Sequence, residues 1–166
     1  MIQNLIKPEG AFEHFMAGLL SSGWIDHFTW STGTTIQEVR TSLGGPCPKG
    51  ASRTHKNAPD GIIHALQVRA CANSRIGIDL EWFDELRQAP VLRKLAKRFE
   101  LPTAESSIQT MEEWCRREAA YKAYCNHDKF PGIHIGNIMT MAGFEFKLSH
   151  AGNWILCFAK IQGSNQ

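Results

Sequence analysis

One uninterrupted stretch of helix-forming sequence, residues 111–125, carries charged side chains where a helix packed on a protein would be apolar. It contains no Gly or Pro, and its Ala, Glu, Arg, Lys and Met content favours a helix. One stripe of that helix is formed by Trp114, Cys115, Glu118, Ala119 and Lys122. The apolar members indicate that this stripe faces the protein, where charges must be paired, solvated in a cleft or bound to an ion. The simplest alternative is an ordinary surface Glu–Lys pair four residues apart.

A second segment, residues 75–83, alternates apolar and polar side chains and predicts a β-strand. Its polar face carries Gly77, Asp79 and Glu81. Two carboxylates two residues apart on one strand face repel each other unless a cation lies between them. Gly77 leaves room for a ligand or another backbone to approach closely. Carboxylate oxygens in this arrangement suit Mg²⁺, although a solvated acidic strand end is also consistent with the pattern.

The two segments together suggest a single site. Asp79 and Glu81 would offer oxygens from the strand, and Glu118 a third carboxylate from the helix. Lys122, one helical turn beyond Glu118, would direct a positive charge toward an anionic ligand. Three carboxylates and a lysine around one divalent ion are typical of sites that handle phosphate. The residues alone therefore predict metal-dependent phosphate chemistry.

The two motifs also resemble those of a known family. Gly-Ile-Asp-Leu-Glu at 77–81, followed by Trp-Cys-Arg-Arg-Glu-Ala-Ala-Tyr-Lys-Ala at 114–123, is similar to the paired signature of the 4′-phosphopantetheinyl transferases. The acidic pair resembles that of the larger branch, which serves siderophore, polyketide and peptide synthetases. The resemblance covers residues 76–125. It implies an α+β fold of the phosphopantetheinyl transferase type, with antiparallel strands packed with helices.

The resemblance also implies a reaction and roles for individual residues. Asp79, Glu81 and Glu118 would hold Mg²⁺ against the pyrophosphate of coenzyme A. Glu118 would also act as the base that deprotonates a serine of an acyl or peptidyl carrier protein. Lys122 would bind phosphate and protonate or stabilise the leaving group, 3′,5′-ADP. The alternatives are a catalytically silent relative that binds coenzyme A or a carrier domain, and a structural α+β domain in which the motifs occur by chance.

A basic segment precedes the acidic strand. In the larger branch a Ser-His motif stands before that strand and helps to bind the 3′-phosphate and pyrophosphate of coenzyme A. Here Thr54-His55 occupies this place, so the resemblance implies that His55 binds coenzyme A, with Thr54 where the family has Ser. Arg53 and Lys56 make the segment basic, as a phosphate-binding edge would be, and are candidate contacts too. An unrelated exposed His in a polar loop is the alternative.

The length of the chain limits how much of the larger branch it can contain. Its 166 residues suffice for one domain, or a domain with an appendage. Larger members contain two similar halves with coenzyme A between them. We expect residues 60–166 to form one such half and residues 1–59 a reduced N-terminal part with a helix, short strands and the basic loop. Either that part is pared down, giving a monomer, or a second copy completes the cleft, giving a homodimer.

Composition narrows the setting. A net charge of +2 is too small to predict general nucleic-acid binding. No apolar run approaches the roughly 18 residues of a membrane helix, and the N-terminus lacks a signal pattern. The five cysteines are odd in number and lack Cys-x-x-Cys spacing, which disfavours zinc binding and a disulfide framework. We therefore expect a cytoplasmic protein that binds neither nucleic acid nor membrane.

The remaining periodicities complete an α+β pattern. Helices are expected from residue 8 to a stop at Gly23 and over 86–99. Strands are expected over the following ranges: short ones within 24–41, then 62–71, 75–83, 130–147 and 154–160.

Overall fold

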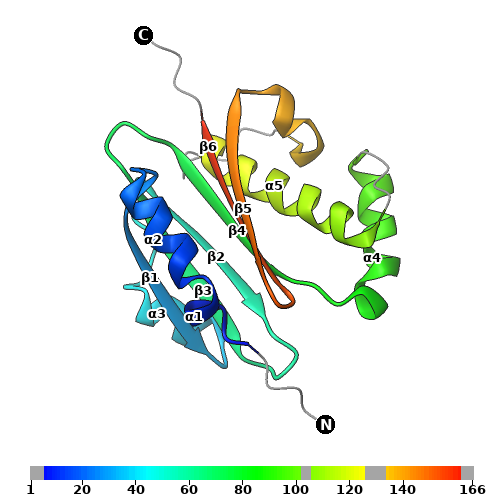
Figure 1. Cartoon of the computed structure of the whole chain (residues 1–166), viewed down its shortest axis with the longest axis horizontal. Coiled ribbons are helices and arrows are strands. Elements are labelled where there is room, and N and C mark those ends of the chain that lie inside the picture. The colour runs from blue at the N-terminus through cyan, green and yellow to red at the C-terminus, as the bar shows by residue number, and fades with distance from the viewer. Residues whose placement is uncertain (1–5, 102–105, 126–133, 162–166) are drawn as a thin grey trace.

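Two three-stranded antiparallel sheets, with helices packed on them, form the framework of the protein (Figure 1). The computed structural model describes residues 6–101, 106–125 and 134–161. The strands are β1 (Ile25–Gly33), β2 (Ala51–Asn57), β3 (Ile63–Ala70), β4 (Ile76–Trp82), β5 (Phe144–Ala151) and β6 (Trp154–Ile161). The helices are α1 (Pro8–Ala11), α2 (Glu13–Ser21), α3 (Ile36–Ser42), α4 (Glu85–Arg98), α5 (Ser107–Cys125) and the 3₁₀ helix η1 (Ile135–Thr140). The predicted α+β class is thus confirmed.

The two sheets have the same topology. Their strand orders are β1-β3-β2 and β4-β6-β5, so the third strand of each lies in the middle. In each sheet, helical segments lie between the first and second strands along the chain. These are α3 between β1 and β2, and α4 and α5 between β4 and β5. The chain therefore consists of two β-α-β-β units, which we call the N-terminal unit (25–70) and the C-terminal unit (76–161). They meet at the turn 71–75, because β3 pairs with β1 and β2 and so belongs to the N-terminal unit.

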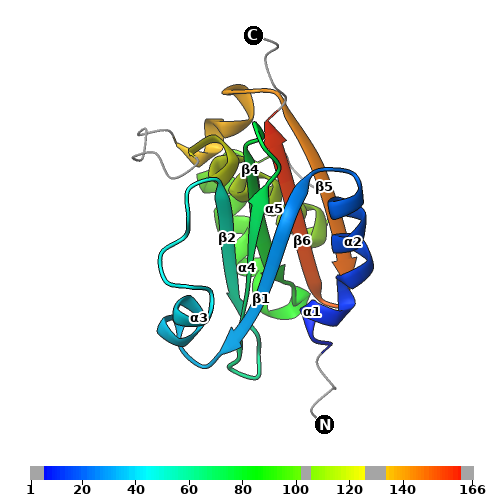
Figure 2. The same cartoon turned by 90° about the vertical axis from the view of Figure 1, so that its left-hand side faces the viewer.

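Two hydroxyl groups join the edge strands β2 and β4, which lie next to each other in Figure 2. Ser52 Oγ accepts a hydrogen bond from the Ile78 N–H at 3.1 Å. Thr54 Oγ1 accepts one from the Leu80 N–H, also at 3.1 Å. Each side-chain oxygen thus accepts a hydrogen bond from a buried backbone N–H, which in a continuous sheet would bond to a carbonyl of the neighbouring strand. The units are fixed side by side although β4 pairs through its backbone with β6.

Strand β4 separates two hydrophobic cores. Its apolar face, with Ile76, Ile78 and Leu80, packs into a core shared with α2 and β3. Its opposite face lies against α5, whose Cys115 and Ala119 are fully buried in the second core. The face assignment made from the alternation is therefore confirmed.

Gly77 is the point where α5 comes closest to β4. A Cβ atom at this position would overlap the Ala119 carbonyl oxygen and the Ala123 nitrogen of the helix backbone. The space that Gly77 leaves is therefore filled by another backbone, one of the two options that the sequence left open. This contact sets how near the charged side chains of α5 lie to those of β4.

Two segments differ from the predicted pattern. Within 24–41, which we expected to hold only strands, β1 is followed by α3. Thr35 begins this helix through a capping box: its hydroxyl accepts from the Glu38 N–H at 3.2 Å, and Glu38 Oε2 accepts from the Thr35 N–H at 3.3 Å. In the predicted strand 130–147, residues 130–133 lie outside the described residues, and η1 precedes β5, which begins only at Phe144.

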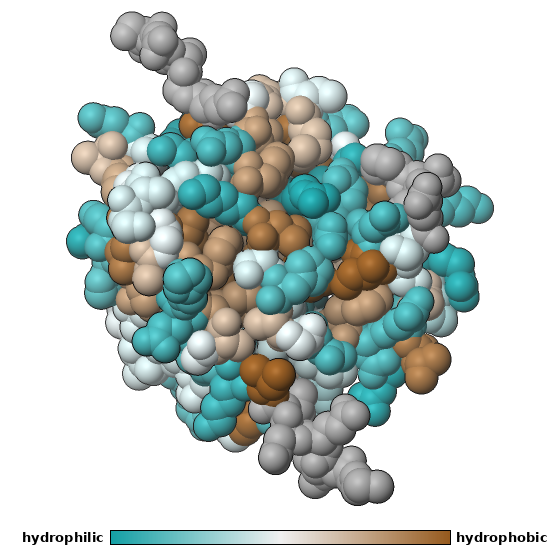
Figure 3. Space-filling view, viewed as in Figure 1, coloured by the Kyte–Doolittle hydropathy of each residue, from teal (hydrophilic) through white to brown (hydrophobic). Residues whose placement is uncertain are grey.

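None of the helices in the part of the chain that the structure describes is long and apolar enough to cross a bilayer. On the face shown in Figure 3, hydrophilic and hydrophobic residues are interspersed. Both ends of the described chain lie at the periphery of the molecule (Figure 1).

Candidate functional site

Helix α5 places Lys122 and Glu118 against the polar face of β4. Lys122 Nζ donates to Asp79 Oδ1 at 2.7 Å and lies 3.9 Å from Glu118 Oε2. Thr54 Oγ1 donates to the same Asp79 Oδ1 at 3.2 Å. Asp79 is only 5% exposed, and its second oxygen, Oδ2, is buried without a hydrogen-bond partner among the described residues. The structure thus brings Asp79, Glu118 and Lys122 together, as the two sequence motifs predicted.

Burial and charge set the ionisation of this cluster. Burial opposes the charge on Lys122, but the carboxylates of Asp79 and Glu118 outweigh it and raise the Lys122 pKa above its ordinary value. For Glu118, burial first and the charge of Asp79 second raise the pKa, against a lowering effect of Lys122. Lys122 is therefore firmly cationic at neutral pH, and Glu118 is a stronger base than an exposed glutamate.

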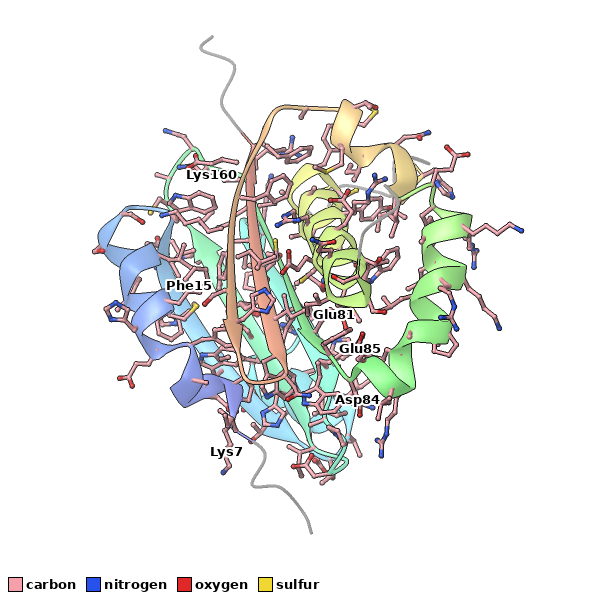
Figure 4. The ribbon with its side chains drawn as sticks, turned by 45° about the vertical axis from the view of Figure 1, so that its right-hand side comes forward. Lys7, Phe15, Glu81, Asp84, Glu85 and Lys160 are labelled. Atoms are coloured by element: carbon pink, nitrogen blue, oxygen red, sulfur yellow. The ribbon has the colours of Figure 1, made fainter. Side chains whose placement is uncertain are left out.

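Glu81, the second carboxylate of β4, has a different partner. Its Oε2 atom contacts Lys56 Nζ of β2. Figure 4 shows Glu81 beside the first turns of α5, with Asp84 and Glu85 at the start of α4. Burial, followed by the charge of Asp79, raises the pKa of Glu81 to about 7, although Lys56 lowers it. The two carboxylates of one strand face are thus each held by a separate lysine.

The donor set fits Mg²⁺ in its chemistry, since carboxylate oxygens are the ligands this ion prefers. Asp79 Oδ2 is a buried oxygen with no partner in the described residues, which is where a cation would be most stabilising. The described ranges nevertheless contain no group of three or more His, Cys, Asp or Glu side chains close enough to hold a metal ion. Asp79 and Glu118, which both approach Lys122, are the pair that can face a common ion.

A cleft of about 1080 Å³ opens beside this cluster. The N-terminal unit contributes α3, the loop 45–47 and β2 to its walls, and the C-terminal unit contributes α5. Glu118, Lys122 and the exposed His55 line it. The volume is slightly above the roughly 300–1,000 Å³ that small-molecule sites typically occupy. His55 thus lies at the cleft, and its contact with coenzyme A stays a prediction.

Arg40 is a cleft residue that the sequence did not indicate. It lies on α3, the helix that the pattern of 24–41 failed to predict, and it lines the cleft. Burial, then the charges of Lys122 and Arg40, lower the pKa of His55, so all three groups share one electrostatic environment. The capping box of α3, formed by Thr35 and Glu38, was the sequence signal that could have predicted this helix. The cleft therefore concentrates positive charge from both units, as an anionic ligand requires.

Arg53 and Lys56, the other predicted contacts, are placed differently. Arg53 lines the cleft, but Nη1 donates to the Gly45 carbonyl at 2.7 Å, Nη2 to the Leu43 carbonyl at 3.2 Å, and Nε to Gln67 at 3.0 Å. It therefore holds the loop that forms the cleft wall. Lys56 lines a smaller hollow of about 220 Å³, together with Glu81 and Trp114.

No protein-family model matches this chain, and no curated protein matches it.

Proposed function

We propose that this protein is a 4′-phosphopantetheinyl transferase that moves the 4′-phosphopantetheine group of coenzyme A to a serine of an acyl or peptidyl carrier protein. The observation that carries the proposal is that two distant motifs meet beside one cleft, which Glu118 and Lys122 line. Lys122 Nζ lies 2.7 Å from Asp79 Oδ1 and 3.9 Å from Glu118 Oε2, beside a hollow that also contains Arg40 and His55. Carboxylates and cations at one wall suit a ligand whose phosphates need both a metal ion and direct positive charge.

The arrangement of the two units supports the same reading. Coenzyme A would lie between α3 of the N-terminal unit and α5 of the C-terminal unit, in the cleft that both line. The repeated β-α-β-β topology is consistent with a fold of two similar halves, which we propose is of the phosphopantetheinyl transferase type. Because one chain supplies both walls, a monomer would be sufficient for binding, and a homodimer is not required.

The residues suggest a balanced reaction. Glu118 would accept the proton of the carrier serine while the serine oxygen attacks the β-phosphorus of coenzyme A. The new bond joins the serine oxygen to that phosphorus, and the bond from the phosphorus to the bridging oxygen breaks. Lys122 would stabilise or protonate the departing oxygen of 3′,5′-ADP. Arg40 and His55 would orient the remaining phosphates, so that attacking and leaving oxygens lie in line.

Mg²⁺ held by Asp79 and Glu118 would neutralise charge on the pyrophosphate. Glu81, the third carboxylate that the resemblance implies, pairs with Lys56 instead. Asp79 would keep its Oδ1 on Lys122 and Thr54 while offering the partnerless Oδ2. Thr54 thereby orients the carboxylate from β2, which explains why a hydroxyl residue precedes His55. The strand–strand junction and the site are built by the same side chain.

The direct test is intact-mass analysis of several apo carrier proteins mixed with this protein, coenzyme A and Mg²⁺. We expect a mass gain equal to one phosphopantetheine group on at least one carrier, and none in EDTA. A serine-to-alanine version of the same carrier is the matched control and should gain nothing. Absence of any gain across acyl and peptidyl carriers, with folded protein present, would contradict the proposed transfer.

A second candidate is a catalytically silent relative that binds coenzyme A or a carrier domain. One observation favours it: Asp79 and Glu81 are each occupied by a lysine, and no three-residue metal group is found in the described ranges. It predicts that isothermal calorimetry detects coenzyme A binding while the mass assay detects no product. Product formation in the mass assay would exclude it.

A further inference from the structure

The two carboxylates on the polar face of β4 are held by lysines that come from different elements. Asp79 pairs with Lys122 of α5, at the wall of the large cleft. Glu81 pairs with Lys56 of β2, at the wall of the small hollow between α4 and α5. Apolar side chains of α4 and α5 line most of that hollow. The two ion pairs therefore face separate spaces, although their acidic members are two residues apart.

The Lys56–Glu81 pair is largely removed from water. The side chain of Glu81 is 10% exposed and that of Lys56 is 31% exposed. A carboxylate buried to this extent needs a partner, and taking away one member of such a pair leaves an uncompensated charge. For Glu81 to turn to a metal ion, it would have to give up Lys56 beside the apolar wall of the hollow. No comparable cost applies to Glu118, whose side chain is 29% exposed.

The charges in the cluster lead to the same conclusion. Counted as formal charges, Lys56 and Lys122 compensate two of the three carboxylates, leaving at most one uncompensated negative charge. A site with so little net charge binds a bare divalent ion weakly. It becomes favourable when phosphate oxygens of a ligand complete the coordination, as Mg²⁺ sites with one or two carboxylates usually require.

We propose that Lys56 keeps Glu81 in an ion pair, so that Asp79 and Glu118 are the only carboxylates among the described residues of this cluster that are offered to Mg²⁺. Lys56 is then a positioning residue: it keeps Glu81 out of the metal site and holds the end of β4 against β2. A consequence is that Mg²⁺ and coenzyme A bind cooperatively, the ion binding poorly without the nucleotide. This inference rests on the proposed function, and it departs from the three-carboxylate set that the family resemblance implied.

The test uses a variant that removes the pair without changing the net charge, Lys56→Met with Glu81→Gln. Coenzyme A affinity is measured by calorimetry across a magnesium titration for this variant, for the wild type and for Asp79→Asn. The quantity compared is the factor by which Mg²⁺ increases the affinity for coenzyme A. We expect this factor to stay within about threefold of wild type in the double variant and to be at least about tenfold smaller in Asp79→Asn. A loss in the double variant as large as that of Asp79→Asn would make Glu81 a ligand and overturn the proposal.

A second variant tests the proposal if the first does not fold. Exchanging the charges, Lys56→Glu with Glu81→Lys, retains an ion pair at the same place. We expect it to keep the magnesium dependence of coenzyme A binding, since neither Asp79 nor Glu118 changes. Loss of that dependence in a variant with wild-type circular dichroism would overturn the proposal. The single change Lys56→Met should lower the denaturation midpoint more than the charge-neutral double variant does.

The wild-type titration distinguishes failure of the proposed function from failure of the inference about Glu81. If the wild type binds coenzyme A with no magnesium dependence, the proposed function and this inference fail together. If magnesium increases the coenzyme A affinity of the wild type but not that of the charge-neutral variant, the proposed function stands. The proposal that Lys56 keeps Glu81 out of the metal site then fails.

Discussion

The N-terminal and C-terminal units share a strand order but differ in the helices between their first and second strands. The N-terminal unit has α3 with 7 residues, whereas the C-terminal unit has α4 with 14 and α5 with 19. The long helix crosses β4 closely at Gly77 and presents Glu118 and Lys122 to Asp79. The short helix contributes Arg40 to the opposite wall of the cleft. Under the proposed function, the same topology would supply the reacting groups in one unit and cations that bind the ligand in the other.

The strongest way to test this division is Glu118→Gln. The change is nearly isosteric, so the fold should be kept, while the proposed base and one metal ligand are lost. We expect transfer to fall about 10²–10⁴-fold, the usual contribution of general base catalysis, or more. The rate is measured by intact mass of the carrier, with circular dichroism as the control for folding. A variant with normal turnover would show that the C-terminal unit does not provide the base.

A second change breaks the C-terminal unit structurally. Gly77→Ala places a Cβ against the backbone of α5 at Ala119 and Ala123, neither of which can move aside as a side chain can. We expect a loss of about 1–3 kcal/mol or more in the free energy of unfolding, measured by urea denaturation. Gly10→Ala is a matched control, because an added Cβ there meets nothing within 4 Å. Equal stability of the two variants would contradict the close approach of α5.

Arg40→Gln addresses the N-terminal unit. Loss of the cation at the cleft wall should weaken coenzyme A binding about ten- to hundredfold, as expected for a charge-assisted hydrogen bond of roughly 1.5–3 kcal/mol. Calorimetry measures the affinity, and Arg69→Gln is the control, since the Arg69 side chain pairs with Asp26 instead. Equal affinity of the two variants for coenzyme A would show that Arg40 of the N-terminal unit does not bind the phosphates of coenzyme A.

The junction between the units can be tested at Ser52. Ser52→Ala leaves the Ile78 N–H buried without its acceptor, which should cost about 1 kcal/mol or somewhat more. Chemical denaturation measures the change, and hydrogen exchange should show faster exchange of the Ile78 amide. Ser74→Ala, in the exposed turn between the units, is the control. Unchanged protection of Ile78 would indicate that the hydroxyl does not join β2 to β4.

The smallest expected effect concerns pH and the N-terminal unit. Glu9 Oε1 lies 3.1 Å from the Nδ1 atom of the buried His64. Burial raises the Glu9 pKa, but the hydrogen bond and charge of His64 outweigh it and hold the pKa below the ordinary 4.5. A lowered carboxyl pKa gives stability that is present above pH 4.5 and is lost as the pH falls through the folded-state value. Glu9→Gln should therefore lessen the acid sensitivity of unfolding between pH 5 and 3, followed by thermal denaturation.

The strand β4 and the helix α5 could be predicted because their periodicities are long and unbroken. Alternation placed Asp79 and Glu81 on the face opposite Ile78, and helical spacing placed Glu118 and Lys122 on one stripe. Both assignments depend only on local geometry. The same argument gave the α+β class but not the equal strand order of the two units, since the pairing of β3 is a tertiary property.

The partners of the charged residues could not be predicted in this way. A basic segment predicts proximity to phosphate, yet Lys56 contacts Glu81 and Arg53 donates to backbone carbonyls. Alternation along β2 turns Lys56 away from its neighbour His55, and only the strand lying beside β2 decides what each meets. Arg40 was missed because α3 is too short for its periodicity to stand out from the strand-like residues before it.

The hydrogen bonds of Arg53 have a consequence for the entropy of binding. They fix the carbonyls of Leu43 and Gly45 at the point where the chain passes through two glycines with φ of +83° and +84°. Two successive glycines would otherwise leave this wall of the cleft conformationally free. Because the guanidinium orders the segment when the protein folds, a ligand meets a wall that is already in place. The conformational freedom of the loop is lost on folding, and the affinity for a ligand is correspondingly higher.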